Sequence, residues 1–237
     1  MQNVTEKDRG GEVLLIIPAH NEEENLVEVV RDIEAQEEKL SYIIVSDGST
    51  DGTVALCRRE GYPCIVLPVN LGLAGCFQTG MKYAYREGYQ YAVQFDGDGQ
   101  HRAADVAVLK EKMEEGSYDL VLGSRFLERR KGSSARETGS RLLTAVIRLT
   151  TGKTVTDPTC GLRLYSRRAI GDFANRMNYG PEPDTVSYLI KRGYRIAEAA
   201  VEIRERQAGQ SYLRPLNAAW YMLRMLVSIL FVQRFRT

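Results

Sequence analysis

Short apolar runs that alternate with helical segments constrain the fold of this 237-residue chain more than any other feature. Each run is four or five residues long, as expected of strands buried on both faces. The predicted strands are 13–17, 42–45, 64–67, 91–95 and 118–122. Strands that alternate with helices imply βαβ units, so the predicted fold class is α/β with a parallel sheet and right-handed crossovers. Polar motifs after the strands are then expected to share one edge of the sheet, where open α/β folds bind ligands.

Helices are predicted between these strands and after them. Asn21 is expected to cap the first helix, which carries three glutamates in its first turn and reaches about residue 36. A short helix is expected to end near Gly61. The remaining helices are predicted at 73–86, 105–114, 138–151, 168–176 and 184–192, with a last strand near 195–203. The segment 128–136 is too basic and polar for a core, which predicts a mobile loop.

Composition excludes several classes of protein. Hydrophobic residues make up 43% of the chain and charged residues 27%, as in an ordinary globular protein, and the net charge of +1 indicates neither nucleic-acid binding nor an acidic tail. The four cysteines form no CxxC pair and are expected to be reduced core residues. Residues 1–9 lack the apolar stretch of a secretory signal, so exposure to the cytosol is expected.

A final apolar segment, 215–232, predicts an amphipathic helix. Asn217, Arg224 and Ser228 fall on one narrow stripe of that helix. A spanning helix needs about 20 mostly apolar residues and a central arginine is costly in a bilayer, so lying in the membrane interface is favoured over crossing it. Packing on its own domain or on a partner subunit carries equal weight. The predicted division is a domain at 1–212 followed by this helix at 213–237.

The segment 94–101 holds the most informative chemistry. Asp96 and Asp98 stand one residue apart at the end of a predicted strand, where they would repel each other unless a cation or hydrogen-bond donors neutralised them. Hard oxygen ligands suit Mg²⁺ or Mn²⁺, and Mg²⁺ often binds one or two carboxylates and completes its shell with phosphate and water. A divalent cation that holds a diphosphate is therefore predicted here.

Other interpretations of this segment depend on single positions. A dinucleotide fingerprint would need glycine at position 102, where Arg102 stands. A calcium loop would need glutamate at position 107, where Ala107 stands. A plain acidic turn without a bound cation remains an alternative interpretation of this segment. His101 is expected to have a structural role or to support the metal ligands rather than to bind the metal.

A second polar turn, 47–52, follows the second predicted strand. A calcium loop fails there as well, because its twelfth position would be Arg58. Asp47 can accept a hydrogen bond from a base or a ribose, while Ser49, Thr50 and Asp51 cap the helix that follows. Both roles can coexist in one turn.

Five motifs occur in the order seen in family 2 glycosyltransferases of the GT-A fold. They are Ile17–Glu22, Val45–Thr53, Asn70–Gly72, Asp96–His101 and Gly123–Arg125. Each is weak alone, but the ordered set is strong and resembles the polyprenyl-phosphate sugar synthases similar to dolichol-phosphate mannose synthase, over residues 12–212. The resemblance implies a Rossmann-like, mostly parallel central sheet flanked by helices. It also implies inverting transfer of a sugar from a UDP- or GDP-sugar to a polyprenyl phosphate.

The resemblance also implies roles for individual residues. The implied nucleotide-binding residues are Pro18, His20, Glu22, Val45, Asp47 and Asp96. The implied ligands of Mg²⁺ or Mn²⁺ are Asp96, Asp98 and Gln100. The implied catalytic residues are Asp98, Arg125, Arg136 and Asp157, of which the two arginines would face phosphates and Asp157 would orient or deprotonate the acceptor. Arg206 and Ser211 fall in a late loop that would close over a substrate.

The nature of the acceptor decides whether a base is needed. A phosphate acceptor needs none, whereas a sugar hydroxyl would need Asp157, Glu182 or Asp184 within hydrogen-bond reach. The alternative functions are therefore extension of a cell-surface polysaccharide or other glycan, and a nucleotide-sugar-binding subunit without turnover. The expected location is cytoplasmic, peripheral at the inner face of the cell membrane, with the C-terminal helix on the membrane surface, no nucleic-acid partner, and homo-oligomer formation left open.

Overall fold

The computed structural model describes residues 9–129, 131–132, 134–204 and 215–234. Its strands are β1 (Arg9–Ala19), β2 (Ser41–Asp47), β3 (Cys64–Leu67), β4 (Tyr89–Gln94), β5 (Leu120–Ser124), β6 (Arg163–Ser166) and β7 (Ile196–Ala200). Its helices are α1 (Leu26–Glu34), α2 (Thr53–Glu60), α3 (Gly72–Arg86), α4 (Asp105–Gly116), α5 (Ala135–Thr151), α6 (Arg167–Asn175), α7 (Pro183–Lys191) and α8 (Pro215–Leu230), followed by a 3-10 turn (Val232–Arg234).

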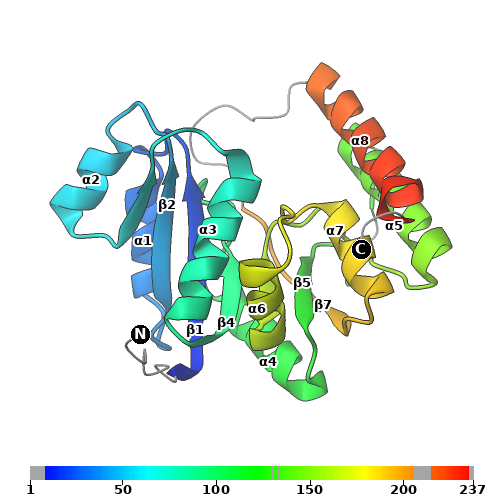
Figure 1. The fold of residues 1–237 in the computed structure, drawn as a ribbon, viewed down its shortest axis with the longest axis horizontal. Coiled ribbons are helices and arrows are strands. Elements are labelled where there is room, and N and C mark those ends of the chain that lie inside the picture. The colour runs from blue at the N-terminus through cyan, green and yellow to red at the C-terminus, as the bar shows by residue number, and fades with distance from the viewer. Residues whose placement is uncertain (1–8, 130, 133, 205–214, 235–237) are drawn as a thin grey trace.

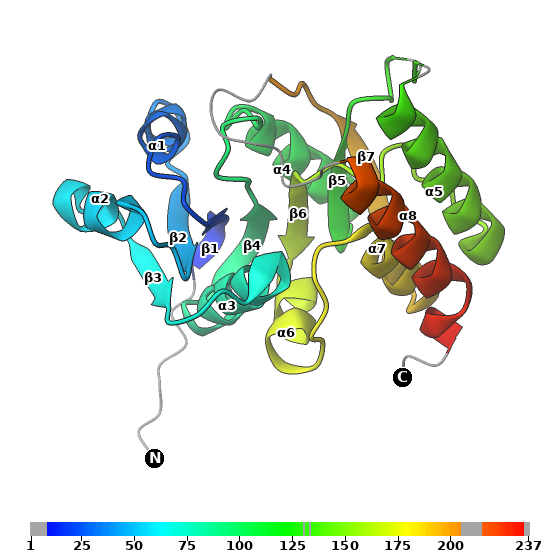
Figure 2. The same ribbon diagram turned by 90° about the horizontal axis from the view of Figure 1, so that it is seen from above.

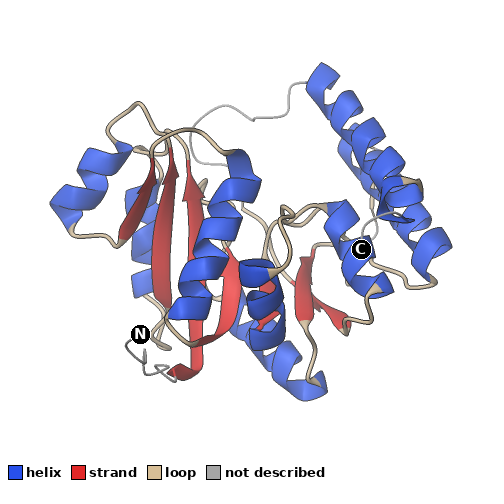
Figure 3. Cartoon of the chain, in the orientation of Figure 1, coloured by secondary structure: helices blue, strands red, loops and turns tan. Residues whose placement is uncertain are grey.

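The strands form one central sheet in the order β3-β2-β1-β4-β6-β5-β7, with helices around it (Figure 3). Strands β1, β2, β3 and β4 run parallel, as do β5 and β7. Of the strands in the described residues, β6 alone is antiparallel to its neighbours, β4 and β5. The predicted α/β class with a mostly parallel sheet is confirmed.

Two apolar layers, one on each face of the sheet, build the core. Leu14 and Ile16 of β1 belong to the layer that contains α3 and α6, whereas Leu15 and Ile17 belong to the layer that contains α1 and α4 (Figures 1 and 2). All four side chains are fully buried. The continuous apolar run of the sequence therefore had the predicted cause, which is burial of the strand on both faces.

The start of the first helix differs from the prediction. Helix α1 begins at Leu26, and Asn21 lies five residues earlier in a left-handed conformation, with a φ of 57°. The Asn21 side-chain oxygen accepts hydrogen bonds from the backbone N–H groups of Thr50 and Asp51, at 2.8 and 3.3 Å. Asn21 therefore joins two loops instead of capping a helix. Its short side chain can do so because asparagine tolerates the left-handed region.

Helix α8 packs against α5 and α7. Met225 and Ile229 are buried in the core, and the Ser228 hydroxyl donates to the Asp184 carboxylate at 2.5 Å. On the predicted polar stripe, Ser228 faces the protein while Arg224 is exposed; the side chain of Asn217 lies outside the described residues. In the described part of the chain, no helix has the length and apolar character needed to span a bilayer.

Candidate functional site

The sequence-predicted site residues lie at strand ends and in loops along one edge of the sheet, at the carboxyl ends of its parallel strands. Pro18, His20 and Glu22 come from the end of β1 and the loop after it, Val45 and Asp47 from β2, Asp96, Asp98 and Gln100 from the loop after β4, Arg125 from the end of β5 and Asp157 from the loop before β6. Pro18 and Val45 are direct partners in the β1–β2 ladder. The side chain of Arg136, in the first turn of α5, lies outside the described residues, as do Arg206 and Ser211.

The loops after β1 and β2 interlock. The backbone N–H of Asn21 donates to the Ser49 hydroxyl at 3.2 Å, and the backbone N–H of Glu22 donates to the Thr53 hydroxyl at 3.0 Å. In the opposite direction, the N–H of Gly52 donates to the carboxylate of Glu23 at 2.9 Å. The expected walls of the nucleoside pocket are therefore held to each other by hydrogen bonds before any ligand binds.

Asp47 anchors the start of α3. Its two carboxylate oxygens accept the backbone N–H groups of Leu71 and Gly72, at 2.6 and 2.8 Å, and its side chain is buried. These N–H groups stand at a helix N-terminus, where a carboxylate is stabilised by unpaired donors and by the helix dipole. Sequence analysis missed this contact. The predicted contact of Asp47 with a base or ribose stays a prediction. The ligand would have to donate to carboxylate oxygens that already accept the N–H groups of Leu71 and Gly72.

Gly48 allows the Asp47 turn to approach the segment before α3. Its φ is +60°, and a Cβ atom there would lie 2.7 Å from the backbone nitrogen of Asn70 and 2.8 Å from the carbonyl carbon of Val69. Any side chain would therefore separate the two segments. Gly48 therefore allows the backbone of the Asp47 turn to pack closely against the segment before α3.

Asp96 and Asp98 have different surroundings. Asp96 accepts hydrogen bonds from Gln94 at 3.2 Å and from His101 Nε2 at 3.1 Å, and 35% of its side chain stays exposed. Burial by itself would raise the pKa of Asp96, but the hydrogen bond and charge of His101 bring the pKa below its usual value. Asp98 is more buried and accepts the backbone N–H of Gln100 at 3.1 Å. His101 thus supports Asp96, in agreement with its predicted supporting role.

These residues fit a cation that shares its shell with a diphosphate. Among the described residues, no group of three or more His, Cys, Asp or Glu side chains is placed to hold a metal ion. Two carboxylates suit Mg²⁺ or Mn²⁺, which fill their other positions with phosphate oxygens and water. Gly161 lets its backbone lie close to the Asp96 carboxylate, because a Cβ atom there would lie 2.4 Å from Asp96 Oδ2. Binding of the ion by Gln100 stays a prediction.

Arg125 and Asp157 bind each other. Arg125 Nε lies 2.6 Å from Asp157 Oδ2 and Arg125 Nη2 lies 2.9 Å from Oδ1, and Arg125 also donates to the Thr159 hydroxyl. Burial acts to lower the pKa of Arg125, but the hydrogen bond and charge of Asp157 raise it. Asp157 is fully buried. The pair is therefore a structural ion pair in this structure, and the implied catalytic roles of both residues stay predictions.

Two residues that sequence analysis did not select hold the loop that carries Asp157. The Glu198 carboxylate accepts the backbone N–H groups of Thr156 and Asp157, at 2.8 and 2.9 Å. The buried Arg163 donates to the backbone carbonyls of Cys160 and Pro158, at 2.9 and 3.0 Å. Glu198 was an available signal, because it is a charged residue inside the last predicted strand. Arg163 gave none, because its strand was not predicted.

A cavity of about 1110 Å³ opens between α5, residues 126–129, Lys131, Thr154 and Thr156. Its lining combines the cationic residues Arg129, Lys131, Arg141 and Arg148 with the apolar residues Phe126, Leu127, Ala145 and Leu149. A second cavity of about 200 Å³ shares Phe126 and Arg129 with it and is also lined by Arg125. The larger cavity thus offers positive charge and apolar surface together, close to the ion pair.

Lys131 lies in the segment 128–136, for which the sequence predicted a mobile loop, and it contacts α5. Its ammonium group donates to the hydroxyls of Ser140 and Thr144 on α5, at 2.9 and 3.2 Å. Burial lowers the pKa of Lys131 below its usual value. The segment that carries Lys131 is therefore attached to α5 along the wall of the larger cavity.

Comparisons with known proteins agree with this geometry. The family model described as "Glycosyl transferase family 2" matches residues 14–173. The polyprenol monophosphomannose synthase of Mycolicibacterium smegmatis is 27% identical over 217 residues, which cover 86% of this chain and 82% of the relative. The UDP-N-acetylglucosamine–dolichyl-phosphate N-acetylglucosaminyltransferase of Methanococcus voltae is 31% identical over 178 residues, which cover 67% of this chain and 70% of the relative.

The fold is also found in a solved structure. Glucosyl-3-phosphoglycerate synthase from Mycobacterium tuberculosis, crystallised with Mn²⁺, UDP-glucose and phosphoglyceric acid, matches with a TM-score of 0.67. The identity is 20%, and the match covers 95% of this chain and 80% of that one. At this identity the similarity shows a shared fold and no more.

Proposed function

Because the chain belongs to glycosyltransferase family 2, we propose that it transfers a sugar from a UDP- or GDP-sugar to a polyprenyl phosphate, with inversion of the anomeric carbon and with Mg²⁺ or Mn²⁺ bound. The observation that carries this proposal is the cavity lined by both cationic and apolar side chains beside Arg125. An acceptor with an anionic head and a hydrocarbon chain matches such a lining. Both relatives described above are named for lipid phosphates, and they differ in the sugar.

The donor half of the site is the edge formed by the loops after β1, β2 and β4. Asp96 is ionised and partly exposed, and Asp98 lies two residues further on. A cation held there would neutralise the charge that develops on the leaving diphosphate. The interlocked loops around Asn21 would receive the nucleoside. The base and the sugar are left open between UDP- and GDP-sugars.

The state of three carboxylates favours a phosphate acceptor over a sugar hydroxyl. Asp157 is fully buried against Arg125, Glu182 accepts the hydroxyl of Tyr221, and Asp184 accepts the hydroxyl of Ser228. Each of the three carboxylates that the sequence offered as a candidate base is thus held by an ion pair or a hydrogen bond to a neighbouring side chain. A hydroxyl acceptor would need one of them as a base, whereas a phosphate oxygen is already anionic at neutral pH.

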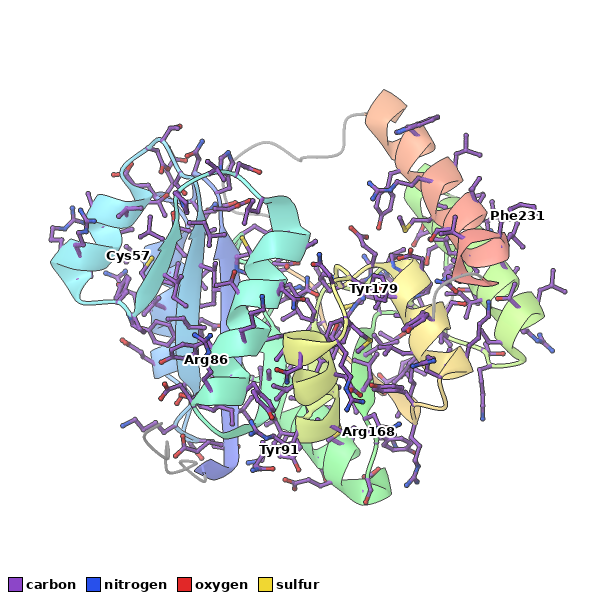
Figure 4. The ribbon with its side chains drawn as sticks, viewed as in Figure 1. Cys57, Arg86, Tyr91, Arg168, Tyr179 and Phe231 are labelled. Atoms are coloured by element: carbon purple, nitrogen blue, oxygen red, sulfur yellow. The ribbon has the colours of Figure 1, made fainter. Side chains whose placement is uncertain are left out.

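The outer face of α8 supports a location at the inner face of the cell membrane. Trp220, Leu223, Val227 and Phe231 follow one another at spacings of three and four residues, and all four are exposed. Figure 4 shows Phe231 on the side of α8 that points away from the protein. Exposed aromatic and aliphatic side chains on one helix stripe bind the interface of a bilayer. We propose that this face lies on the membrane that contains the acceptor lipid.

A direct assay tests the proposed reaction. The purified chain is mixed with vesicles that contain a polyprenyl phosphate and with radiolabelled GDP-mannose, UDP-glucose or UDP-N-acetylglucosamine. We expect label in the lipid fraction from at least one donor, with Mn²⁺ or Mg²⁺ present and not with a chelator. The matched control acceptor is the same polyprenol without phosphate. Transfer to that alcohol or to an oligosaccharide, with none to the phosphate, would exclude the proposed acceptor.

Substitutions on α8 test the membrane face. Deleting residues 213–237 is an unsuitable test, because it would remove Met225 and Ile229 from the core and expose the apolar side chains that they cover. We expect Trp220→Ser combined with Phe231→Ser to weaken binding to anionic vesicles by about tenfold or more, since burial of one large apolar side chain is worth about 1.5–3 kcal/mol. Vesicle sedimentation measures the change. The matched control, Val108→Ser on α4, removes an exposed apolar side chain elsewhere and should bind like the unmodified chain; equal binding by all three proteins would contradict the proposal.

A further inference from the structure

Asp32, on α1, contacts the end of the loop that carries Asp96 and Asp98. Helices α1 and α4 cover the same face of the sheet, and this loop leads into α4 (Figure 2). The Asp32 carboxylate accepts the backbone N–H of Ala103 at 2.7 Å. Ala104, the N-cap residue of α4, makes no side-chain cap hydrogen bond. A carboxylate from another helix therefore accepts a donor at the start of α4, where negative charge is favourable.

The other carboxylate oxygen of Asp32 binds a third segment of the chain. Arg204, which follows β7, donates from Nη1 and Nη2 to Asp32 Oδ1, each at 3.3 Å. The backbone N–H of Arg204 donates to the carbonyl of Gln100 at 2.9 Å. Two residues earlier, Glu202 forms an ion pair with Arg102. Asp32 is thus joined to the loop directly and through Arg204, although these partners lie 71 and 172 residues away in the sequence.

A cavity of about 210 Å³ lies between α1 and this loop. Gly99 and His101 line it from the loop, Val29 and Asp32 line it from α1, and Arg204 lines it as well. The side chains of α1 therefore do not fill the space behind Gly99 and His101, and close packing does not fix the loop on this side. The position of the loop here depends on the hydrogen bonds that Asp32 and Arg204 make beside the cavity.

We propose that Asp32 is a positioning residue for the divalent cation, because it holds the loop 96–103 in the arrangement in which Asp96 and Asp98 bind one ion. This inference rests on the proposed function, since it concerns the ion of the donor half. Mg²⁺ demands nearly ideal octahedral geometry, so a small displacement of its ligands weakens binding. Groups that orient metal ligands from outside typically account for about 10–100-fold in metal affinity. Asp32 acts through the backbone of the loop.

The affinity of the full chain for Mn²⁺ tests the proposal, measured with UDP and with GDP from the electron paramagnetic resonance signal of free Mn²⁺. We expect Asp32→Ala to raise the Kd for Mn²⁺ by about 10–100-fold. Asp32→Asn should restore most of the affinity, because its side-chain oxygen can still accept the N–H of Ala103. A residue that only stabilises the fold would change Tm without changing this Kd. An equal Kd for Asp32→Ala and the unmodified chain would overturn the proposal.

Asp119 provides a matched control at the opposite edge of the sheet, directly before β5. Its carboxylate also accepts one backbone N–H, from Arg195 at 2.8 Å, and one guanidinium, from Arg168 at 3.1 Å. Asp119→Ala should therefore lower Tm in the same way but keep the Kd for Mn²⁺. An equal loss of affinity in Asp119→Ala would mean that general destabilisation weakens the site, and it would overturn the specific role of Asp32.

Hydrogen exchange of the metal-free chain separates this proposal from the proposed function. The amides of residues 97–103 should exchange faster in Asp32→Ala than in the unmodified chain, and Asp119→Ala should leave them unchanged. Unchanged exchange in Asp32→Ala would overturn the positioning role, whatever the ion does. Faster exchange, together with no Mn²⁺ binding by the unmodified chain with either nucleotide, would place the failure in the donor half of the proposed function and would remove the ion that Asp32 is proposed to position.

Discussion

Asp98→Asn is expected to abolish the metal-dependent stabilisation of the protein by UDP or GDP and to lower kcat/KM by on the order of 10²–10³-fold, the usual loss when one stabilising group at a developing charge is removed. The substitution keeps the shape of the side chain and an oxygen for the N–H of Gln100. It removes the negative charge that the cation needs. Thermal-shift titration with each nucleotide, with and without Mn²⁺, measures the first effect, because a ligand that binds only the folded state raises Tm.

A matched acid on the next helix provides the control. Asp105 is buried at the start of α4, and burial raises its pKa, so its charge is already unfavourable there. Asp105→Asn should therefore keep the nucleotide-induced shift and the rate of transfer. If Asp98→Asn also kept the full Mn²⁺-dependent shift, the cation would have to bind elsewhere and the donor half of the proposed site would be wrong.

The sequence predicted those strands that stand out locally as runs of mostly apolar residues. The run 13–17 contains only apolar side chains, and every one of them is buried in β1. Strand β6 was missed, because its four residues begin with Arg163 and pair antiparallel with strands distant in sequence. The guanidinium of Arg163 is tolerated there because carbonyls of the preceding loop accept its hydrogen bonds. No local pattern carries that information.

In the candidate site, likewise, the sequence predicted the positions of the motifs but not the partners of their charged groups. The motifs were expected at the carboxyl ends of parallel strands, and the structure has them there, since chain direction alone sets that edge. The partners of the charged groups could not be predicted. Asp47 bonds to a helix start 24 residues later in the sequence, and Asp157 pairs with an arginine 32 residues away. Such pairs depend on where the tertiary fold places each strand end.

The C-terminal helix shows that polar residues on one helical stripe can have different surroundings. Arg224 is exposed. Ser228 instead satisfies the buried Asp184, and exposed apolar side chains take the outer face. A polar side chain is buried wherever a fixed partner accepts its hydrogen bond. Only the tertiary contact could identify that partner.

Asp157→Ala is expected to lower the free energy of unfolding by about 3–5 kcal/mol, the cost of removing one partner of a buried ion pair. Arg125 would keep its charge with only 20% of its side chain exposed. For a chain of this length, Tm should fall by roughly 6–20 °C, which calorimetry measures. The control is the double variant Arg125→Met with Asp157→Leu, which removes both charges and should recover much of the loss. A Tm unchanged by Asp157→Ala would mean that the pair adds no stability.

The pH dependence of the transfer rate distinguishes a phosphate acceptor from a hydroxyl acceptor that would need Asp157 as its base. With a polyprenyl phosphate, the rate should fall as pH drops through about 6, because the phosphate itself gains a proton there. Asp157→Asn, assayed at a temperature at which it remains folded, should keep that acidic limb even if its rate is lower, since the titrating group belongs to the acceptor. Loss of the limb in the variant would make Asp157 the titrating base. That result would favour a hydroxyl acceptor, and with it the extension of a glycan.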